Sequence, residues 1–440
     1  MEPSRPIQHP RRAAAAALVG TTIEWYDFFV YGTAAVLVFG QLFFPSADPV
    51  ASLLAALATF AVGFLARPLG GFIFGHLGDR IGRKRTLIAT LVLMGCATTG
   101  VGLLPTYATA GVWAPILLVA LRLLQGVSVG GEWGGAVLIA SEHAPIERRT
   151  WFASFAQLGS PLAVLLSMGA FRVATALSRS QFEAWGWRLP FLASVILLLV
   201  GFLIRLSVSE SPEFARAETE KAVVRFPLEL ALRTAPGPIL MTLCSFTIGT
   251  AGFYFTNTFL IAYATQSLSI SRSLVLSCLV VVSVVQLFGQ LGAALIAERI
   301  GDGRFLKWSA SLAIVAPYPM FLLVETRAPL AIIVGVSLAT LCASGFYAVI
   351  AGFVSKIFPT NIRYTAISVA YQVGGAIFGG LTPIIGVLLS SRFVGHWWPL
   401  AVFYSLLAAL SLGGVAFLCR AGYDKVEQAG VEKPGATLQG

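Results

Sequence analysis

The feature that most constrains this sequence is a series of long apolar runs separated by short polar loops. We count twelve runs, each long enough to cross a bilayer as a helix. We expect them at residues 15–40, 51–77, 86–104, 112–141, 150–177, 187–207, 237–263, 272–297, 305–324, 328–355, 363–390 and 397–419. Inside a bilayer, backbone groups must be satisfied within the protein, so these runs predict an all-α integral membrane protein.

The composition supports this prediction. Hydrophobic residues make up 57% of the 440 residues and charged residues 11%, against about 25% in a typical soluble domain. A soluble core could not absorb so much apolar sequence. The net charge of +10 does not indicate nucleic-acid binding, because the basic residues lie in short loops between the apolar runs.

Lys and Arg are distributed unequally between the two sides of the membrane. With an internal N-terminus, one side receives most basic loop residues, whereas the other receives only six arginines. By the positive-inside rule, both termini are cytoplasmic. The first run continues past Glu24 and Asp27, so we expect a membrane helix there and not a cleaved signal peptide.

The longest polar stretch, 207–236, divides the runs into two sets of six. Part of it, 211–225, has caps and charges suited to a surface helix. We therefore predict two pseudo-symmetric six-helix bundles with cytoplasmic connections. The predicted segments are a cytoplasmic N-terminus (1–14), a first bundle (15–207), a central loop (208–236), a second bundle (237–419) and a cytoplasmic tail (420–440).

An internal repeat supports this division. Gly70 and Asp79-Arg80-Ile81-Gly82 match Gly289 and Glu298-Arg299-Ile300-Gly301 at a constant offset of 219 residues. Each copy falls at the end of the second run of its half. Two six-helix halves related by a parallel repeat are an architecture of secondary transporters.

The loop Gly75–Arg85 resembles the signature that follows the second helix of the major facilitator superfamily. The stretch Arg122–Gly126 resembles a second motif, found in proton-coupled members. Further stretches are similar to the metabolite:proton symporter family, at 24–28, 67–71, 130–135, 186–191, 210–214 and 358–364. The resemblance extends from about Gly20 to Leu418, and the N-terminal half is most similar to the shikimate-type branch.

Buried carboxylates are the candidates for proton coupling. A charge inside an apolar run costs on the order of 2.5–3.5 kcal/mol, so it needs a partner or a cavity. Glu24 and Asp27 are three residues apart, near one face of the first helix. Two carboxylates at that depth do not easily both stay ionised, so we expect one to hold a proton. Glu132, in a glycine-rich stretch, is the third candidate; the alternative for each is a structural role in ion pairing or close packing.

Buried arginines are the candidates for substrate binding. Arg122 is expected to neutralise a carboxylate, either the substrate's or one on the first helix, and to line one cavity with Glu132 at a different depth. Arg67 is the second candidate. For both, the alternative is a fixed ion pair between helices.

Polar residues without charge complete the predicted binding site. In the first half these are Tyr31, Gln125, Trp133 and Gln157. The second half has almost no charge inside its runs, and its candidates are Tyr254, Asn257, Gln286, Tyr371 and Gln372, with Gln290 and Tyr347 near them. The alternative for each is a packed or hydrogen-bonded role between helices.

The signature loop is expected to act as a cytoplasmic gate, through Gly75, Gly78, Asp79, Arg80, Gly82, Arg83 and Arg85. Asp79 is expected near a helix N-terminus or paired with a basic residue. The arginines would bind neighbouring helix ends or anionic lipids, unless the loop only sets the topology. In the second copy, Asp302 and Gly303 stand where basic residues would, which weakens a gating role there.

No feature indicates an enzyme. The histidines are not spaced for a metal, and the glycine-rich stretches do not follow strands, so we expect no metal or cofactor. The resemblance implies alternating access driven by a proton gradient, in a monomer of the bacterial inner membrane contacting lipid and no nucleic acid. It implies uptake of a small organic acid such as shikimate or a di- or tricarboxylate. The alternatives are proton symport of proline or betaine, drug/proton antiport, and a membrane sensor that transports nothing.

Overall fold

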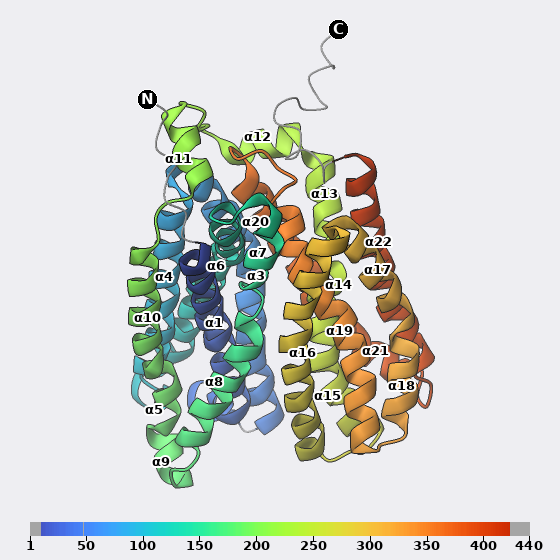
Figure 1. Ribbon diagram of the computed structural model, residues 1–440. Helices are drawn as coiled ribbons and strands as arrows, with labels where there is room; N and C mark the ends of the chain where they lie inside the picture. Colours follow the sequence, from blue (N-terminus) through green and yellow to red (C-terminus); the bar gives the residue numbers. More distant parts are fainter. Residues whose placement is uncertain (1–9, 47, 423–440) are drawn as a thin grey trace. The chain divides into compact units, whose positions relative to one another are not determined.

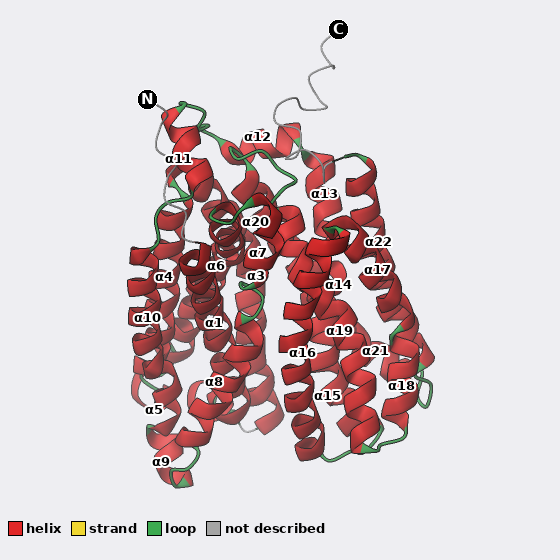
Figure 2. Cartoon of the chain, in the orientation of Figure 1, coloured by secondary structure: helices red, strands yellow, loops and turns green. Residues whose placement is uncertain are grey.

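The computed structural model describes residues 10–46 and 48–422 (Figure 1). Every regular element in these residues is helical (Figure 2). The chain forms two compact units, with the boundary between Leu228 and Glu229. Residues 1–9 of the predicted N-terminal segment and 423–440 of the predicted tail lie outside the described range.

Unit 1 contains the first six apolar runs. Its elements are α1 (Pro10–Ala34), η1 (Ala35–Phe39), α2 (Gly40–Phe43), α3 (Pro49–Ile81), α4 (Arg83–Leu103), α5 (Tyr107–Ala110), α6 (Trp113–Glu142), η2 (Ile146–Arg148), α7 (Arg149–Ser154), α8 (Gly159–Ala174), α9 (Arg179–Ala184), η3 (Gly186–Arg188), α10 (Leu189–Ser207) and α11 (Pro212–Thr219). The helix α12 (Pro227–Thr234) contains the boundary.

Unit 2 contains the last six runs. Its elements are α13 (Pro236–Ser245), α14 (Thr247–Tyr254), η4 (Phe255–Phe259), α15 (Leu260–Ala262), η5 (Tyr263–Ser267), α16 (Arg272–Ile300), α17 (Asp302–Val315), α18 (Pro317–Glu325), α19 (Pro329–Val354), α20 (Arg363–Gly374), η6 (Gly375–Gly379), α21 (Gly380–Arg392) and α22 (Trp398–Arg420).

The predicted membrane fold is confirmed. Within the described residues, eleven helices are long and apolar enough to span a membrane. A twelfth span arises if α1 and the segment Leu37–Phe43, bent by 41°, are counted as one. Six of these twelve spans then belong to each unit, and the protein is a multi-pass membrane protein.

Several spans are less regular than a continuous apolar run suggests. The fifth is broken at residues 155–158, between α7 and α8, and π-helical segments interrupt the first, seventh and eleventh spans. Pro68 and Pro383 lie inside α3 and α21. Such irregularities are tolerated in membrane helices because neighbouring groups satisfy the freed backbone atoms. Hydropathy does not reveal them.

In unit 1, α3 and α6 pack most extensively. Their backbones approach so closely that a Cβ on Gly70 would collide with the backbone of Val127, and one on Gly130 with the backbone of Arg67. The glycine-rich stretch of α6 therefore serves helix packing. The corresponding spans of unit 2, α16 and α19, also form its most extensive contact, as the sequence repeat predicts.

The surface helix predicted at 211–225 is present but shorter. It is α11, which begins after Ser211 and ends at Thr219. The Ser211 side chain accepts a hydrogen bond from the Phe214 backbone N–H at 3.2 Å, as an N-cap residue does.

Candidate functional site

Besides the four charged side chains around the turn between α3 and α4 (Asp79, Arg83, Glu142 and Arg149), unit 1 buries six further charged side chains in its spans, each less than a tenth exposed. Three are carboxylates and three are arginines: Glu24, Asp27, Glu132, Arg67, Arg122 and Arg205. In the described part of unit 2, the only buried charged side chain is Arg363, which donates to the Phe358 carbonyl at 2.8 Å. The charged interior therefore belongs to unit 1.

Asp27, on α1, has hydrogen bonds to both carboxylate oxygens. Thr98 of α4 donates to Oδ2 at 2.7 Å, and Ser194 of α10 donates to Oδ1 at 2.8 Å. Thr98 in turn accepts from the Gln125 amide of α6 at 2.8 Å. Three neighbouring helices therefore hold this carboxylate in place.

Arg122 continues this chain. Its Nη1 donates to Gln125 Oε1 at 3.2 Å, and its guanidinium carbon lies 4.2 Å from the centre of the Tyr31 ring. The Tyr31 hydroxyl forms a 2.7 Å hydrogen bond with Thr59 of α3. We call the six residues Asp27, Thr98, Ser194, Gln125, Arg122 and Tyr31 the Asp27 cluster. It unites four predicted site residues, whereas Thr98 and Ser194 were missed because a lone hydroxyl in an apolar run carries no signal.

Arg67, also predicted, lies on aromatic faces. Its guanidinium carbon is 4.4 Å from the centre of the Phe64 ring and 5.1 Å from that of Phe28. A desolvated cation–π contact is worth about 2 kcal/mol, which offsets part of the desolvation of the guanidinium.

Glu132 pairs with Arg205 of α10, a residue that the sequence analysis missed as a site residue. Arg205 also donates to the Leu87 carbonyl, and Thr90 donates to Glu132 Oε2 at 2.8 Å. Arg205 lies near the end of the apolar run expected at 187–207, and its side chain is 4% exposed. The available signal was its position inside the apolar run before Ser207. The expectation that Glu132 lines a cavity with Arg122 is replaced by this ion pair.

Glu24 is partnered differently from the other two carboxylates. It is 6% exposed, and its Oε2 has no hydrogen-bond partner among the described residues. It lines a cavity of about 10 Å³ together with Glu132, Gly20, Met94 and Ser128. A cavity of this size holds about one water molecule.

The remaining predicted residues of unit 1 pair with each other. The Trp133 indole N–H donates to Gln157 Oε1 at 3.1 Å, and both side chains are buried. Gln157 lies at the break between α7 and α8.

Unit 2 gathers several of its predicted residues around a second small cavity. Asn257, Gln286 and Tyr347 line it, with Thr340 and Ser344. Asn257 lies in the π-helical segment η4, a local geometry often found at functional sites. The cavity walls carry amide and hydroxyl groups and no charge.

The other candidates of unit 2 lie near aromatic or glycine residues. The Tyr371 hydroxyl forms a 2.5 Å hydrogen bond with that of Tyr347. Tyr254 packs closely on the backbone at Gly379, where a Cβ would lie 2.9 Å from its ring. Gln372 is buried on α20.

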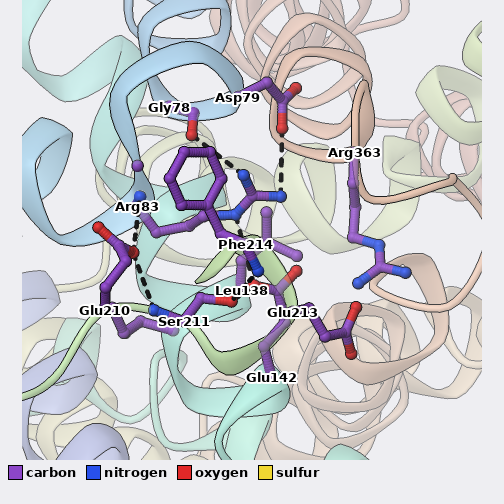
Figure 3. A network of polar contacts seen from close by, with 12 residues as sticks. Gly78, Asp79, Arg83, Leu138, Glu142, Glu210, Ser211, Glu213, Phe214 and Arg363 are labelled. Atoms are coloured by element: carbon purple, nitrogen blue, oxygen red, sulfur yellow. Dashed lines mark hydrogen bonds and ion pairs between the residues drawn. The ribbon is translucent and has the colours of Figure 1, made fainter. Parts of the chain in front are cut away.

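The signature loop forms a single-residue turn. The helix α3 ends at Ile81, α4 begins at Arg83, and Gly82 between them has φ +107°. Figure 3 shows Arg83 at the centre of a buried network. Its guanidinium contacts Asp79 at 3.2 Å, the Gly78 carbonyl at 3.1 Å and Glu142 of α6 at 3.4 Å.

Glu210 provides the N-cap that Gly82 lacks. Its carboxylate accepts from the backbone N–H of Arg83 at 2.9 Å (Figure 3). It also accepts from the backbone N–H of Lys84 at 3.1 Å. These are the first two residues of α4, where orphan N–H groups and the helix dipole favour an anion. In the same network, Ser211 donates to Glu142.

The central segment is attached to this turn by further contacts. Phe214 lies under the Arg83 guanidinium, 5.0 Å from its carbon, and Glu213 pairs with Arg149 of α7 at 2.5 Å. The stretch 210–214, which is similar to the metabolite:proton symporter family, is thus the part of the central segment that binds to the turn. Of the predicted loop residues, Gly75, Gly78, Asp79, Gly82 and Arg83 are buried, and Arg80 and Arg85 are exposed.

Known proteins resemble this chain over most of its length. The family model of the Major Facilitator Superfamily matches residues 17–383. The chain is 37% identical over 416 residues to the shikimate transporter of Escherichia coli (strain K12), covering 94% of each chain. It is 37% identical over 397 residues to the inner membrane metabolite transport protein YhjE of that strain, covering 88% of this chain and 90% of the relative. The proline/betaine transporter of the same strain is 33% identical over 389 residues, with 86% of this chain and 77% of the relative covered.

Solved structures show the same fold. The proton:xylose symporter XylE, bound to 6-bromo-6-deoxy-D-glucose, matches with a TM-score of 0.76 and 16% identity, covering 93% of this chain and 95% of that one. The transporter FucP in the outward conformation matches with a TM-score of 0.66 and 16% identity, covering 91% and 97%.

Proposed function

This chain belongs to the Major Facilitator Superfamily, and from that premise we propose that it takes up a small organic acid by proton symport. The two units would alternate access to the substrate, with both termini on the cytoplasmic side of a bacterial inner membrane. One of the buried carboxylates Asp27, Glu24 and Glu132 would couple transport to the proton gradient. The turn at Gly82 would stabilise one conformation from the cytoplasmic side.

The observation that carries this proposal is the placement of Arg122. Arg122 is 3% exposed and lies inside a membrane helix, within the hydrogen-bonded cluster that holds Asp27. A planar guanidinium is suited to bind a carboxylate with two parallel hydrogen bonds. The 37% identity to a shikimate transporter supports a hydroxylated organic acid as the substrate.

Symport of zwitterionic osmolytes is the second candidate, because relatives named proline/betaine transporters are 33% identical. A zwitterion would use Arg122 for its carboxylate. A quaternary ammonium group would need open aromatic faces. The Phe28 and Phe64 faces near the Asp27 cluster already hold Arg67, which favours the acid.

Uptake into proteoliposomes tests the proposal. With acid outside, we expect radiolabelled shikimate to accumulate above its external concentration and betaine not to accumulate. Arg122→Ala should weaken binding about 10- to 100-fold, the range for losing hydrogen bonds to a charged group. Arg392→Gln, which changes an exposed arginine of unit 2, is the matched control. Efflux of drugs without uptake of any acid or betaine would contradict the proposal.

A further inference from the structure

Building on the proposed proton symport, we infer that Glu24, not Asp27, carries the symported proton. We further infer that one proton enters with each monoanionic substrate molecule. The inference rests on how differently the three buried carboxylates of unit 1 are partnered and on the balance of the buried charges.

Asp27 and Glu132 are each surrounded by groups that donate hydrogen bonds to their carboxyl oxygens. Each Asp27 oxygen accepts a hydroxyl hydrogen bond, from Thr98 at 2.7 Å and Ser194 at 2.8 Å. Glu132 pairs with Arg205 and also accepts from Thr90. Hydrogen bonds donated to a carboxylate, and a cation beside it, stabilise the charged form. A proton on either group would remove the charge that these partners stabilise.

Glu24 lacks such partners. Its Oε2 is buried without a hydrogen-bond partner in the described structure, and the side chain lines the cavity of about 10 Å³ that it shares with Glu132. That cavity holds about one water, which could bring a proton to the carboxylate or take one away. A buried carboxylate oxygen without a hydrogen-bond partner is costly to keep charged, and the cavity leaves room for a water molecule beside it.

The two cations that face Glu24 are already engaged in other contacts. The charged groups around it are Arg67 of α3, Glu132 of α6, Arg205 of α10, and Asp27 on its own helix. Arg205 is engaged with Glu132, and Arg67 lies on the Phe28 and Phe64 rings. Glu24 is thus surrounded by two other carboxylates and by two arginines that each contact another group.

The buried charges determine the order of binding. With Glu24 ionised, the three carboxylates balance the three arginines. An anion entering that balanced set would add an uncompensated buried charge, which is costly in a low-dielectric interior. Protonation of Glu24 leaves one excess positive charge, which the anion then neutralises. The proton therefore binds first, and transport of a monoanion is electroneutral.

Asp27 is then a positioning residue. Through Thr98 it holds Gln125, and Gln125 accepts from Arg122. Its loss should disorder the arginine that binds the substrate, and so impair binding itself and not only the coupling.

Two assays on purified protein in proteoliposomes separate these roles. One measures shikimate accumulation driven by an acid-outside gradient, and the other measures shikimate exchange at equal pH on both sides. Glu24→Gln should lose accumulation but retain exchange within about two-fold, with a flattened pH profile. Asp27→Asn should lose both. Glu24→Asp, which retains an ionisable group, should recover part of the accumulation at a shifted pH optimum.

Several outcomes would overturn the inference. Wild-type accumulation by Glu24→Gln would show that the proton binds elsewhere. Exchange without accumulation in Asp27→Asn would assign the proton to Asp27. Dependence of wild-type shikimate uptake on a potassium–valinomycin potential would contradict the one-to-one ratio. If Glu24→Gln does not fold, an unchanged pH profile in Glu24→Asp overturns it instead. Failure of the wild type to accumulate any acid would instead refute the proposed function.

Discussion

The two copies of the repeated turn have the same backbone but different surroundings. Gly82 and Gly301, 219 residues apart, both have positive φ, at +107° and +95°. At Gly82 a Cβ would collide with the Glu210 carboxylate, whereas at Gly301 it would meet nothing within 4 Å. The residue after the glycine is the fully buried Arg83 in the first turn and Asp302 in the second.

This difference separates what both turns require, a glycine, from what the first turn has in addition, a network of buried charges. Both turns need glycine because a chain that reverses between two membrane helices with one connecting residue must adopt positive φ. In the described part of the chain, the first turn is enclosed by a network of buried charges. At the second turn, Lys356 pairs with Asp302 at 2.8 Å, and both side chains are partly exposed. The charges are reversed relative to the first turn, because the residue after the glycine is the acidic Asp302 and not an arginine.

The largest effect should come from removing Arg83. Arg83→Met leaves Asp79 and Glu142 buried without their shared cation, and breaking a buried pair costs about 3–5 kcal/mol. Unfolding of the purified protein in mixed micelles with increasing sodium dodecyl sulfate measures the loss. The control, Arg85→Met, changes an exposed arginine two residues away and should shift the stability by less than about 0.5 kcal/mol. Equal effects of both variants would mean that the network is not stabilising.

An intermediate effect should distinguish the two glycines. Alanine at either position meets the same backbone strain, about 1–3 kcal/mol for a residue forced into a sparsely populated region. Gly82→Ala should cost about 1 kcal/mol more than Gly301→Ala, because its methyl group displaces the Glu210 cap of α4. The same unfolding assay compares them, and a larger loss at Gly301 would refute the assignment of Glu210 as the cap.

The smallest effect should come from the second turn. Asp302→Asn breaks an ion pair whose partners are 11% and 21% exposed, and we expect a loss of about 1 kcal/mol or less. Unfolding midpoints at low and high salt would test this, because salt screens partly exposed pairs more than buried ones. A loss comparable to that of Arg83→Met would show that charged contacts stabilise both turns to the same extent.

The interiors of the two units differ in the same way as the two turns, because buried charges are concentrated in unit 1. Unit 1 buries ten charged side chains in its spans, whereas the cavity of unit 2 is lined by amides and hydroxyls such as Asn257 and Ser344. The sequence predicts this contrast directly, because charged residues inside apolar runs are visible without any structure. This contrast supports our proposal that proton coupling takes place in unit 1.

Much of the fold and part of the site could be predicted from the sequence. Apolar runs predict the spans, and Asp27, Arg122, Gln125 and Tyr31 were each recognised as polar residues at membrane depth. Their partners were not predictable in the same way. Arg205 lies near a helix end, yet it pairs with Glu132 on another helix. Which oxygen of Glu24 lacks a partner depends on contacts with neighbouring helices, and no periodicity contains that information.

The sequence by itself determined that the protein lies in a lipid bilayer, where its membrane spans are, and that its two halves are repeats. Each of these follows from hydropathy or from the spacing of motifs along the chain. The tertiary structure decided which charges meet: Arg83 with Asp79 and Glu142, and Arg205 with Glu132. The physical reason is that the two effects depend on different neighbours. Burial of a helix in lipid depends on the composition of one stretch of sequence. The charge of a buried carboxylate depends on groups within hydrogen-bonding distance, which come from helices far apart in sequence.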